Sequence, residues 1–352
     1  MIVIASDPHK STHTFAAVEG GIGELRSSET FSACTAGHER ALAWARELGE
    51  ERVWAIEDCR HVSGRLERFL IARGERVVRV PPKLMAGARK SSRERGKSDP
   101  IDALAVARSA LREGVESLPT ARLEGFELEL RLLVDHRERL VGQRTALQND
   151  LRWHLHDLGE LDVPTGALDR LKWHDKLAGR LERHEQTPRV RIARDELRRI
   201  RELTRAVKAF EGEIAVLVDD ICPQLVAEIG CGPLTAAKLV GEIAGADRFA
   251  NDAKLARAAG VAPIPASSGR RDRHRLDRGG NRQLNCALHR LAVNKGRLDP
   301  QSAEYLARKQ AEGKTRREAL RCLKRHLARR VWHLLNQPTS TATPLDTALA
   351  LT

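Results

Sequence analysis

The N-terminal third of the chain combines strand-like and helix-like segments in an order that few folds accommodate. Three strand-like apolar runs come first, at residues 2–6, 12–18 and 25–32. Helix and strand patterns then alternate, at residues 37–48, 52–56, 62–72, 76–80 and from Pro100 onward. Three consecutive strands followed by this alternation predict a mixed sheet covered by helices.

Acidic residues stand at the ends of two of these strands and at the start of the last helix. Asp7 follows the first strand, Glu57 ends the fourth, and Asp99 and Asp102 share the first helical turn. Each alone is typical of a cap or a turn. Together, four carboxylates at one sheet edge need counter-ions, and oxygen-only ligands suit Mg²⁺ or Mn²⁺. The pattern therefore predicts a two-metal site for phosphodiester chemistry, with Asp58 an alternative to Glu57 because a one-residue slip exchanges their faces.

Charge and composition narrow the class of partner. The 352 residues contain 61 Lys and Arg against 48 Asp and Glu, a net charge of +13, which favours nucleic acid as a partner. No long apolar run and no targeting segment are evident, so we expect a cytoplasmic protein that does not bind membranes. Six scattered cysteines without metal-ligand spacing predict reduced, mostly buried thiols.

The middle of the chain is charged and helical. Leucines recur at helical spacing through residues 126–158. In a second helix, apolar residues recur every seven positions at Ile200, Val207, Ile214 and Ile221, with Leu203, Phe210 and Leu217 between them. This pattern predicts a coiled-coil seam, which closes either on the first helix of the same chain or on a second copy.

The C-terminal part carries two motifs suited to phosphate contact. Residues 229–243 resemble a helix-hairpin-helix element, whose Gly-x-Gly turn exposes backbone N–H groups and whose Lys238 is a candidate contact. A later loop contains Ser267 and Ser268 among arginines, although its composition alone is that of a solvated loop. Guanidinium groups bind phosphate in a bidentate manner, so the candidate nucleic-acid contacts are Arg270, Arg271, Arg273, Arg275, Arg278 and Arg282. A disordered tail is predicted for residues 337–352.

Three segments together resemble a known family. Asp7-Pro8-His9-Lys10, residues 55–61 and residues 97–103 are similar to motifs of the DEDD transposases of the insertion sequence 110 family, and the similarity covers nearly the whole chain. The resemblance implies an RNase H/RuvC-like α/β domain at 1–120, a helical coiled-coil connector at 121–222 and a mainly α transposase domain at 223–336. The metal ligands would be Asp7, Glu57, Asp99 and Asp102.

The resemblance also implies an activity. In this family a loop serine becomes covalently joined to DNA, and Ser268, directly before a glycine, is the better match, with Ser267 the fallback. The implied protein is a transposase or recombinase of a bacterial insertion sequence that acts on double-stranded DNA through a phosphoserine intermediate. A non-coding bridge RNA would guide a homodimer or a tetramer. The alternatives are a metal-dependent nuclease that cleaves branched DNA by water attack, and a non-catalytic nucleic-acid-binding scaffold.

Overall fold

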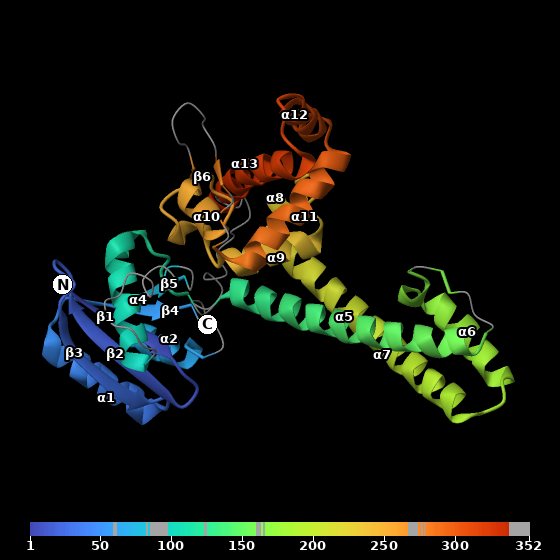
Figure 1. Cartoon of the computed structure of the whole chain (residues 1–352), viewed down its shortest axis with the longest axis horizontal. Coiled ribbons are helices and arrows are strands. Elements are labelled where there is room, and N and C mark those ends of the chain that lie inside the picture. The colour runs from blue at the N-terminus through green and yellow to red at the C-terminus, as the bar shows by residue number, and fades with distance from the viewer. Residues whose placement is uncertain are drawn as a thin grey trace, which may run out of the picture. The chain divides into compact units, whose positions relative to one another are not determined.

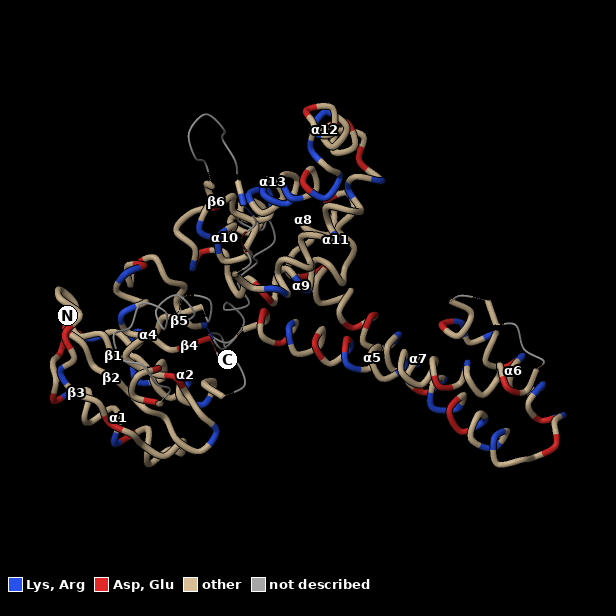
Figure 2. Tube along the Cα trace, viewed as in Figure 1, with Lys and Arg blue, Asp and Glu red and all other residues tan. Residues whose placement is uncertain are grey.

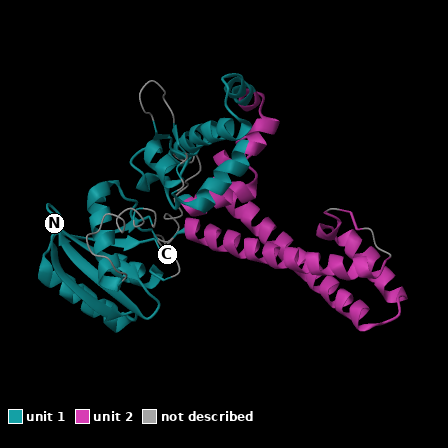
Figure 3. Ribbon diagram, in the orientation of Figure 1, with its two compact units in different colours: residues 1–125, 243–292, 304–338 teal, residues 126–242, 293–303, 339–352 magenta. Residues whose placement is uncertain are grey.

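The chain forms two compact units (Figure 3). The computed structural model describes residues 1–58, 62–81, 84, 98–122, 125–159, 163–164, 166–266, 274–275, 277 and 279–337. Unit 1 comprises residues 1–125, 243–292 and 304–338, and unit 2 comprises residues 126–242, 293–303 and 339–352. Both units are assembled from discontinuous segments, and the domain boundaries at 120, 222 and 336 stay a prediction.

Unit 1 contains a five-stranded mixed sheet in the order β3-β2-β1-β4-β5 (Figure 1). The strands are β1 (Ile2–Pro8), β2 (Thr12–Glu19), β3 (Leu25–Ser32), β4 (Arg52–Glu57) and β5 (Val77–Val80). Neighbouring strands are antiparallel from β1 to β3, whereas β4 pairs in parallel with both β1 and β5. The predicted mixed sheet is therefore confirmed, and the strand ends lie within two residues of the predicted ones.

Helices cover both faces of this sheet. α4 (Asp99–Glu113) packs through Val106 and Ala110 on one face, together with Val3 of β1 and Val53 of β4. α1 (Thr35–Leu48) and α2 (Gly64–Ile71) pack on the other face, around the fully buried Trp54. Because side chains alternate along a strand, odd-numbered residues of β1 and β4 face α4 and even-numbered residues face α1 and α2.

Two buried histidines stack on the side of the sheet that α1 covers. The rings of His13 in β2 and His38 in α1 have centroids 5.3 Å apart and an interplanar angle of 20°. Burial, followed by the charges of His38 and His9, lowers the pKa of His13 from 6.5 to about 4. Burial, followed by the charge of Arg65, also lowers the pKa of His38.

We expect acid to destabilise this sheet between about pH 6.5 and pH 4. In that window the unfolded chain protonates His13 while the folded chain keeps it neutral, so stability falls as the pH falls, by up to about 3 kcal/mol. Hydrogen exchange of the β1 and β2 amides at pH 7 and pH 4.5 measures the effect. A His13→Gln/His38→Gln variant should lose most of this pH dependence, and an unchanged dependence in the variant would refute the assignment.

Unit 2 is built on a helical hairpin. α5 (Phe126–Asp157) and α7 (Pro188–Ile221) run side by side in opposite directions, and α6 (Leu171–Arg183) packs against α7 (Figure 1). The predicted seam residues Ile200, Val207 and Ile214 are buried. The seam therefore closes on the first helix of the same chain, the first of the two predicted alternatives, and dimerisation stays a prediction.

The C-terminal part is mainly helical, as predicted. Its helices are α8 (Pro223–Val226), α9 (Pro233–Ile243), α10 (Asp252–Ala258), α11 (Arg282–Leu298), α12 (Pro300–Ala311) and α13 (Arg316–Asn336). In unit 1, α13 begins with a Thr315/Glu318 capping box and packs on α10, where Arg325 pairs with Asp252 at 2.9 Å. Within the described part of the chain, no helix combines the length and apolar content that crossing a bilayer requires.

The described cysteines are free thiols, as predicted. Burial raises the pKa of Cys222 to about 11 and that of Cys231 to about 12, so both thiols are inert. Cys34 and Cys286 are exposed, and the prediction of mostly buried thiols is wrong for these two. Their exposure follows from their positions, just before α1 and on the solvent side of α11.

Candidate active site

The ends of two parallel strands bring Asp7 and Glu57 next to each other. The register pairs Ser6 of β1 with Ile56 of β4, so the next residue on each strand is again a neighbour. Both acidic residues continue the odd-numbered series that faces α4. Glu57 is buried, with 8% of its surface exposed. One face of the sheet edge therefore presents two adjacent carboxylates.

Asp58 belongs to the opposite face. Its Oδ1 lies 3.7 Å from Nη1 of Arg79, a buried residue of β5 that also binds Glu67 of α2. Asp58 is thus engaged on the side of the sheet that α2 covers. The register favours Glu57 over Asp58 as the carboxylate that accompanies Asp7.

The first turns of α4 add Asp99 and Asp102. Asp102 is 3% exposed and lies on the buried side of α4, the helix that packs against β1 and β2. Nε2 of His9 lies 3.3 Å from Oδ1 of Asp99 and 3.9 Å from Oδ2 of Asp7. The start of α4 therefore sits at the carboxyl end of β1, and these two carboxyl oxygens are at most about 7 Å apart.

These carboxylates match a hard divalent cation in donor chemistry and in backbone placement. Mg²⁺ and Mn²⁺ prefer oxygen ligands, and the acidic residues gather on the α4 side of one sheet edge. The side chains do not close into a cage: no three His, Cys, Asp or Glu side chains in the described ranges converge closely enough to hold a metal ion. The predicted metal site stays a prediction.

The loop that carries the predicted nucleophile is described only at its stem. Ser267, Ser268, Arg270, Arg271, Arg273 and Arg278 lie outside the described residues. The stem is a short antiparallel pair, with β6 (Ile264–Pro265) opposite β7 (His274–Arg275), where the sequence composition predicts a loop. Arg275 and Arg282, the two described members of the arginine set, are both exposed. Their placement is compatible with a phosphate contact.

The two ends of this loop are held together at one point. Gly260 and Gly280 both have positive φ, and a Cβ on Gly280 would lie 2.5 Å from the Gly260 nitrogen, so only glycine fits. Nδ2 of Asn285 donates to the carbonyls of Ala259 and Gly260 at 2.8 and 3.2 Å. The buried Lys324 donates to Oδ1 of Asn285 at 2.8 Å. The residues that flank the loop on both sides are therefore held together by close backbone contact and by hydrogen bonds.

Replacing Asn285 with alanine is expected to lower the free energy of unfolding by about 1–3 kcal/mol, because buried carbonyls and the buried ammonium of Lys324 lose their partner. Hydrogen exchange of the α11 and α13 amides measures this loss. Asn336→Ala, at an exposed position of α13, is the matched control and should change stability by less than about 0.5 kcal/mol. Equal effects of the two substitutions would show that Asn285 does not support the loop base.

The loop stem and the end of β5 border one cavity within unit 1, and the four carboxylates are not among its lining residues. This cavity of about 390 Å³ is lined in part by Pro81, which follows β5, and by Ile264 and Pro265 of β6. An ion pair of 2.7 Å joins Arg257 of α10 to Glu113 at the end of α4. Unit 1 therefore contains both the acidic sheet edge and the base of the serine loop.

Lys238 does not have the role predicted for it. Its side chain is 4% exposed, and its ammonium lies 2.9 Å from Oε2 of Glu138 and 3.2 Å from Oδ1 of Asp135, both in α5. The turn before α9 is engaged as well, since Nδ2 of Asn294 donates to the Gly230 carbonyl at 3.1 Å. Lys238 thus fastens α9 to α5 within unit 2 and is not available to a phosphate.

Comparison with known proteins gives the class. Residues 4–159 match the family DEDD_Tnp_IS110, described as a transposase, and residues 224–307 match Transposase_20, the transposase of the IS116/IS110/IS902 family. The two matches together cover more than half of the chain and include the four carboxylates and the serine loop. The chain is a transposase. It belongs to the IS110 family of insertion-element transposases.

Relatives encoded by other insertion elements extend this match. Over 340 residues the chain is 28% identical to an uncharacterized 44.8 kDa protein of insertion element IS116 from Streptomyces clavuligerus, covering 83% of the chain and 84% of that protein. Over 334 residues it is 27% identical to an uncharacterized 42 kDa protein of IS900 from Mycobacterium paratuberculosis, covering 82% and 83%. A 37% identity over 116 residues links it to an IS110 protein from Streptomyces coelicolor, covering 32% and 29%.

Proposed function

We propose that this transposase cuts and rejoins the ends of its element through a covalent serine–DNA intermediate, in a reaction that depends on Mg²⁺ or Mn²⁺. The observation that carries the proposal is the sheet edge itself. Asp7 and Glu57 are neighbours on the α4 face, and α4 begins at that edge with Asp99 and Asp102. Four acidic residues gathered from two adjacent parallel strands and from α4 are better explained by phosphodiester chemistry than by separate roles in helix caps and turns.

The proposal gives the residues distinct roles. Asp7, Glu57, Asp99 and Asp102 would hold the divalent metal, which when bound withdraws electron density from the scissile phosphate. The Ser268 hydroxyl loses its proton and forms a bond to phosphorus, while the phosphorus bond to a deoxyribose oxygen breaks and that oxygen takes up a proton. The number of phosphodiester bonds is unchanged, so a DNA hydroxyl can reverse the step and join a new strand. Exposed arginines of the loop region, including Arg275 and Arg282, would bind the DNA backbone.

The finer assignments of fold and partners belong to the same proposal. The order β3-β2-β1-β4-β5, in which β2 alone runs against the other four strands, supports an RNase H/RuvC-like domain. The net charge of +13 supports double-stranded DNA and a bridge RNA as partners. Leu203, Phe210 and Leu217 are only half-buried in the hairpin, which supports a second use of that surface in a homodimer or tetramer.

A denaturing gel tests the chemistry directly. The protein, co-expressed with the non-coding DNA that flanks its gene, is incubated with Mg²⁺ and end-labelled DNA spanning the element junction. We expect a labelled protein–DNA adduct with the wild type and with Ser267→Ala, and none with Ser268→Ala or after chelation of the metal. An adduct with Ser268→Ala but not with Ser267→Ala would identify Ser267 as the nucleophile.

Two other outcomes would reject the serine mechanism. Nicked DNA without an adduct, undiminished in Ser268→Ala, would identify a nuclease that uses water. Bound but uncut DNA in every lane, with Asp102→Asn indistinguishable from the wild type, would identify a non-catalytic scaffold.

A further inference from the structure

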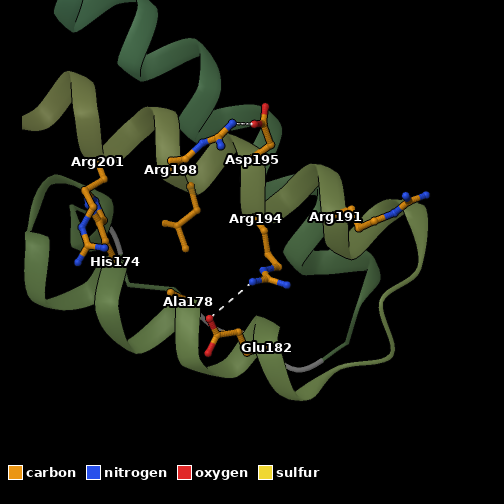
Figure 4. A pocket seen from close by; sticks show the side chains of 9 residues that line it. His174, Ala178, Glu182, Arg191, Arg194, Asp195, Arg198 and Arg201 are labelled. Atoms are coloured by element: carbon orange, nitrogen blue, oxygen red, sulfur yellow. Dashed lines mark hydrogen bonds and ion pairs between the residues drawn. The ribbon is translucent and has the colours of Figure 1, made fainter.

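Unit 2 contains an arginine-lined pocket that the predicted site residues do not include. The pocket has a volume of about 420 Å³ and lies between α6 and α7 (Figure 4). α7 contributes Arg191, Arg194, Arg198 and Arg201, whereas the acidic residues in the lining are Glu182 and Asp195. Positive charge therefore exceeds negative charge in the pocket wall.

The pocket is one end of a longer stripe of positive charge on α7, which we call the α7 cationic stripe. Its members are spaced alternately three and four residues apart, so they share one helical face: Arg191, Arg194, Arg198, Arg201, Arg205 and Lys208. Each directly follows a buried residue of the hairpin seam, so the stripe runs beside that seam. Basic and acidic positions both occur along α7 (Figure 2). At a rise of 1.5 Å per residue it is about 25 Å long, the length of about seven phosphates at 3.4 Å per strand.

Half of this stripe is not engaged by carboxylates. Arg194 lies 3.6 Å from Glu182, and the guanidinium groups of Arg198 and Arg201 each bond to an aspartate. The other three members, Arg191, Arg205 and Lys208, make no ion pair with any residue in the described ranges. The stripe therefore keeps a net positive charge. Its three cations without a described ion pair can bind an anion while the ion pairs of Arg194, Arg198 and Arg201 stay intact.

The wall of the pocket also holds polar atoms whose hydrogen-bonding capacity is unused. His174 is 1% exposed, and its Nε2 lies 2.7 Å from the Leu168 carbonyl, but its Nδ1 has no hydrogen-bond partner in the described part of the chain. The same holds for Nε of Arg201, a buried atom of a partly exposed side chain. Buried polar atoms without a protein partner are rare in protein interiors, and ordered water commonly satisfies them.

We propose that the α7 cationic stripe and its pocket bind the phosphodiester backbone of a duplex nucleic acid. The inference rests on the proposed function, since it gives that function a nucleic-acid contact outside the candidate active site. Guanidinium groups bind phosphate oxygens as bidentate donors, and a row of them follows a backbone without reading its sequence. The shared chemistry is the phosphate backbone, which both the guide RNA and the element DNA present.

The test measures the salt dependence of binding with the full-length protein. The variant Arg191→Gln/Arg205→Gln/Lys208→Gln removes the three cations that have no described ion pair. The control Arg139→Gln/Lys172→Gln/Arg183→Gln makes the same charge change at exposed positions of unit 2 outside the stripe. Fluorescence anisotropy gives the Kd of a 25-base-pair DNA duplex and of an RNA duplex of the same sequence from 50 to 300 mM salt.

We expect the stripe variant to bind at least one duplex about tenfold more weakly at 0.1 M salt, with a log–log salt slope shallower by about 2 to 3, since each lost phosphate contact removes about 0.9. The duplex whose binding is weakened, DNA or RNA, shows which nucleic acid the stripe binds. Equal Kd values and slopes for the stripe variant and the control would overturn this inference alone. The proposed serine chemistry, which the adduct assay tests, would not be affected. Failure of the wild type to bind either duplex would overturn the proposed function as well.

Discussion

The substitution Glu57→Gln is expected to reduce metal-dependent strand cleavage at least about a hundredfold, whereas Asp58→Asn should keep most of it. Glu57 faces α4 beside Asp7, while Asp58 faces α2 beside Arg79. Loss of a residue that merely supports a metal ligand typically costs 10- to 100-fold, and loss of a ligand costs more. Both substitutions replace a carboxylate by its own amide, so shape is conserved and only charge and donor chemistry change.

Single-turnover cleavage of junction DNA, measured over a titration of Mg²⁺, separates the two substitutions. Glu57→Gln should lower the cleavage rate at every metal concentration, and Asp58→Asn should give a curve close to the wild type. The reverse ranking would show that β4 is shifted by one residue in the active protein. Wild-type cleavage rates in both variants would show that the acidic residues at this sheet edge take no part in strand cleavage.

The choice between Glu57 and Asp58 illustrates what sequence reasoning can and cannot reach. The strand ending at these residues is predictable, because Val53, Trp54, Ala55 and Ile56 form a short apolar run before charged residues. The face of each acidic residue is not, because a fully buried strand is apolar on both sides and lacks the alternation that reveals register. The pairing of β4 with β1 supplies that information.

A role that depends on distant partners cannot be predicted from the sequence alone. Lys238 in a basic chain suggests a phosphate contact, yet its partners Asp135 and Glu138 lie about a hundred positions earlier. Asn285 carries no local signal either, because its role at the loop base depends on Lys324, 39 residues away. Such pairings arise from tertiary packing, which no local pattern encodes.

The charged stretch between residues 165 and 190 contains α6 but carries no clear sequence signal for it. Its apolar positions Leu177 and Leu181 are buried in one core cluster with residues of α5 and α7. A helix with a narrow apolar stripe among many charges resembles a solvated segment until its partner is known. The pocket between these two helices was therefore absent from the sequence-based predictions.

A buried ion pair supports the strand that carries Glu57. Arg79 of β5 is 5% exposed and donates to Glu67 of α2 at 3.0 and 2.8 Å, and Glu67 is fully buried. Arg79 also lies 3.7 Å from Asp58, the residue that follows Glu57. Buried pairs of this kind stabilise little in net terms, because desolvation offsets the attraction, but loss of one partner leaves an uncompensated charge.

We therefore expect Arg79→Leu to destabilise the sheet by about 3–5 kcal/mol, and the double replacement Glu67→Leu/Arg79→Leu to restore most of that loss. Because the chain folds as two units, local protection is a better measure than a single unfolding transition. In hydrogen exchange, the amides of β4 and β5 should lose about two to four orders of magnitude of protection in the single variant. Amides of α7 in unit 2 provide the internal control and should be unaffected. If the double variant is as unprotected as the single one, the pair itself stabilises the sheet, and an isolated buried charge is not the cause.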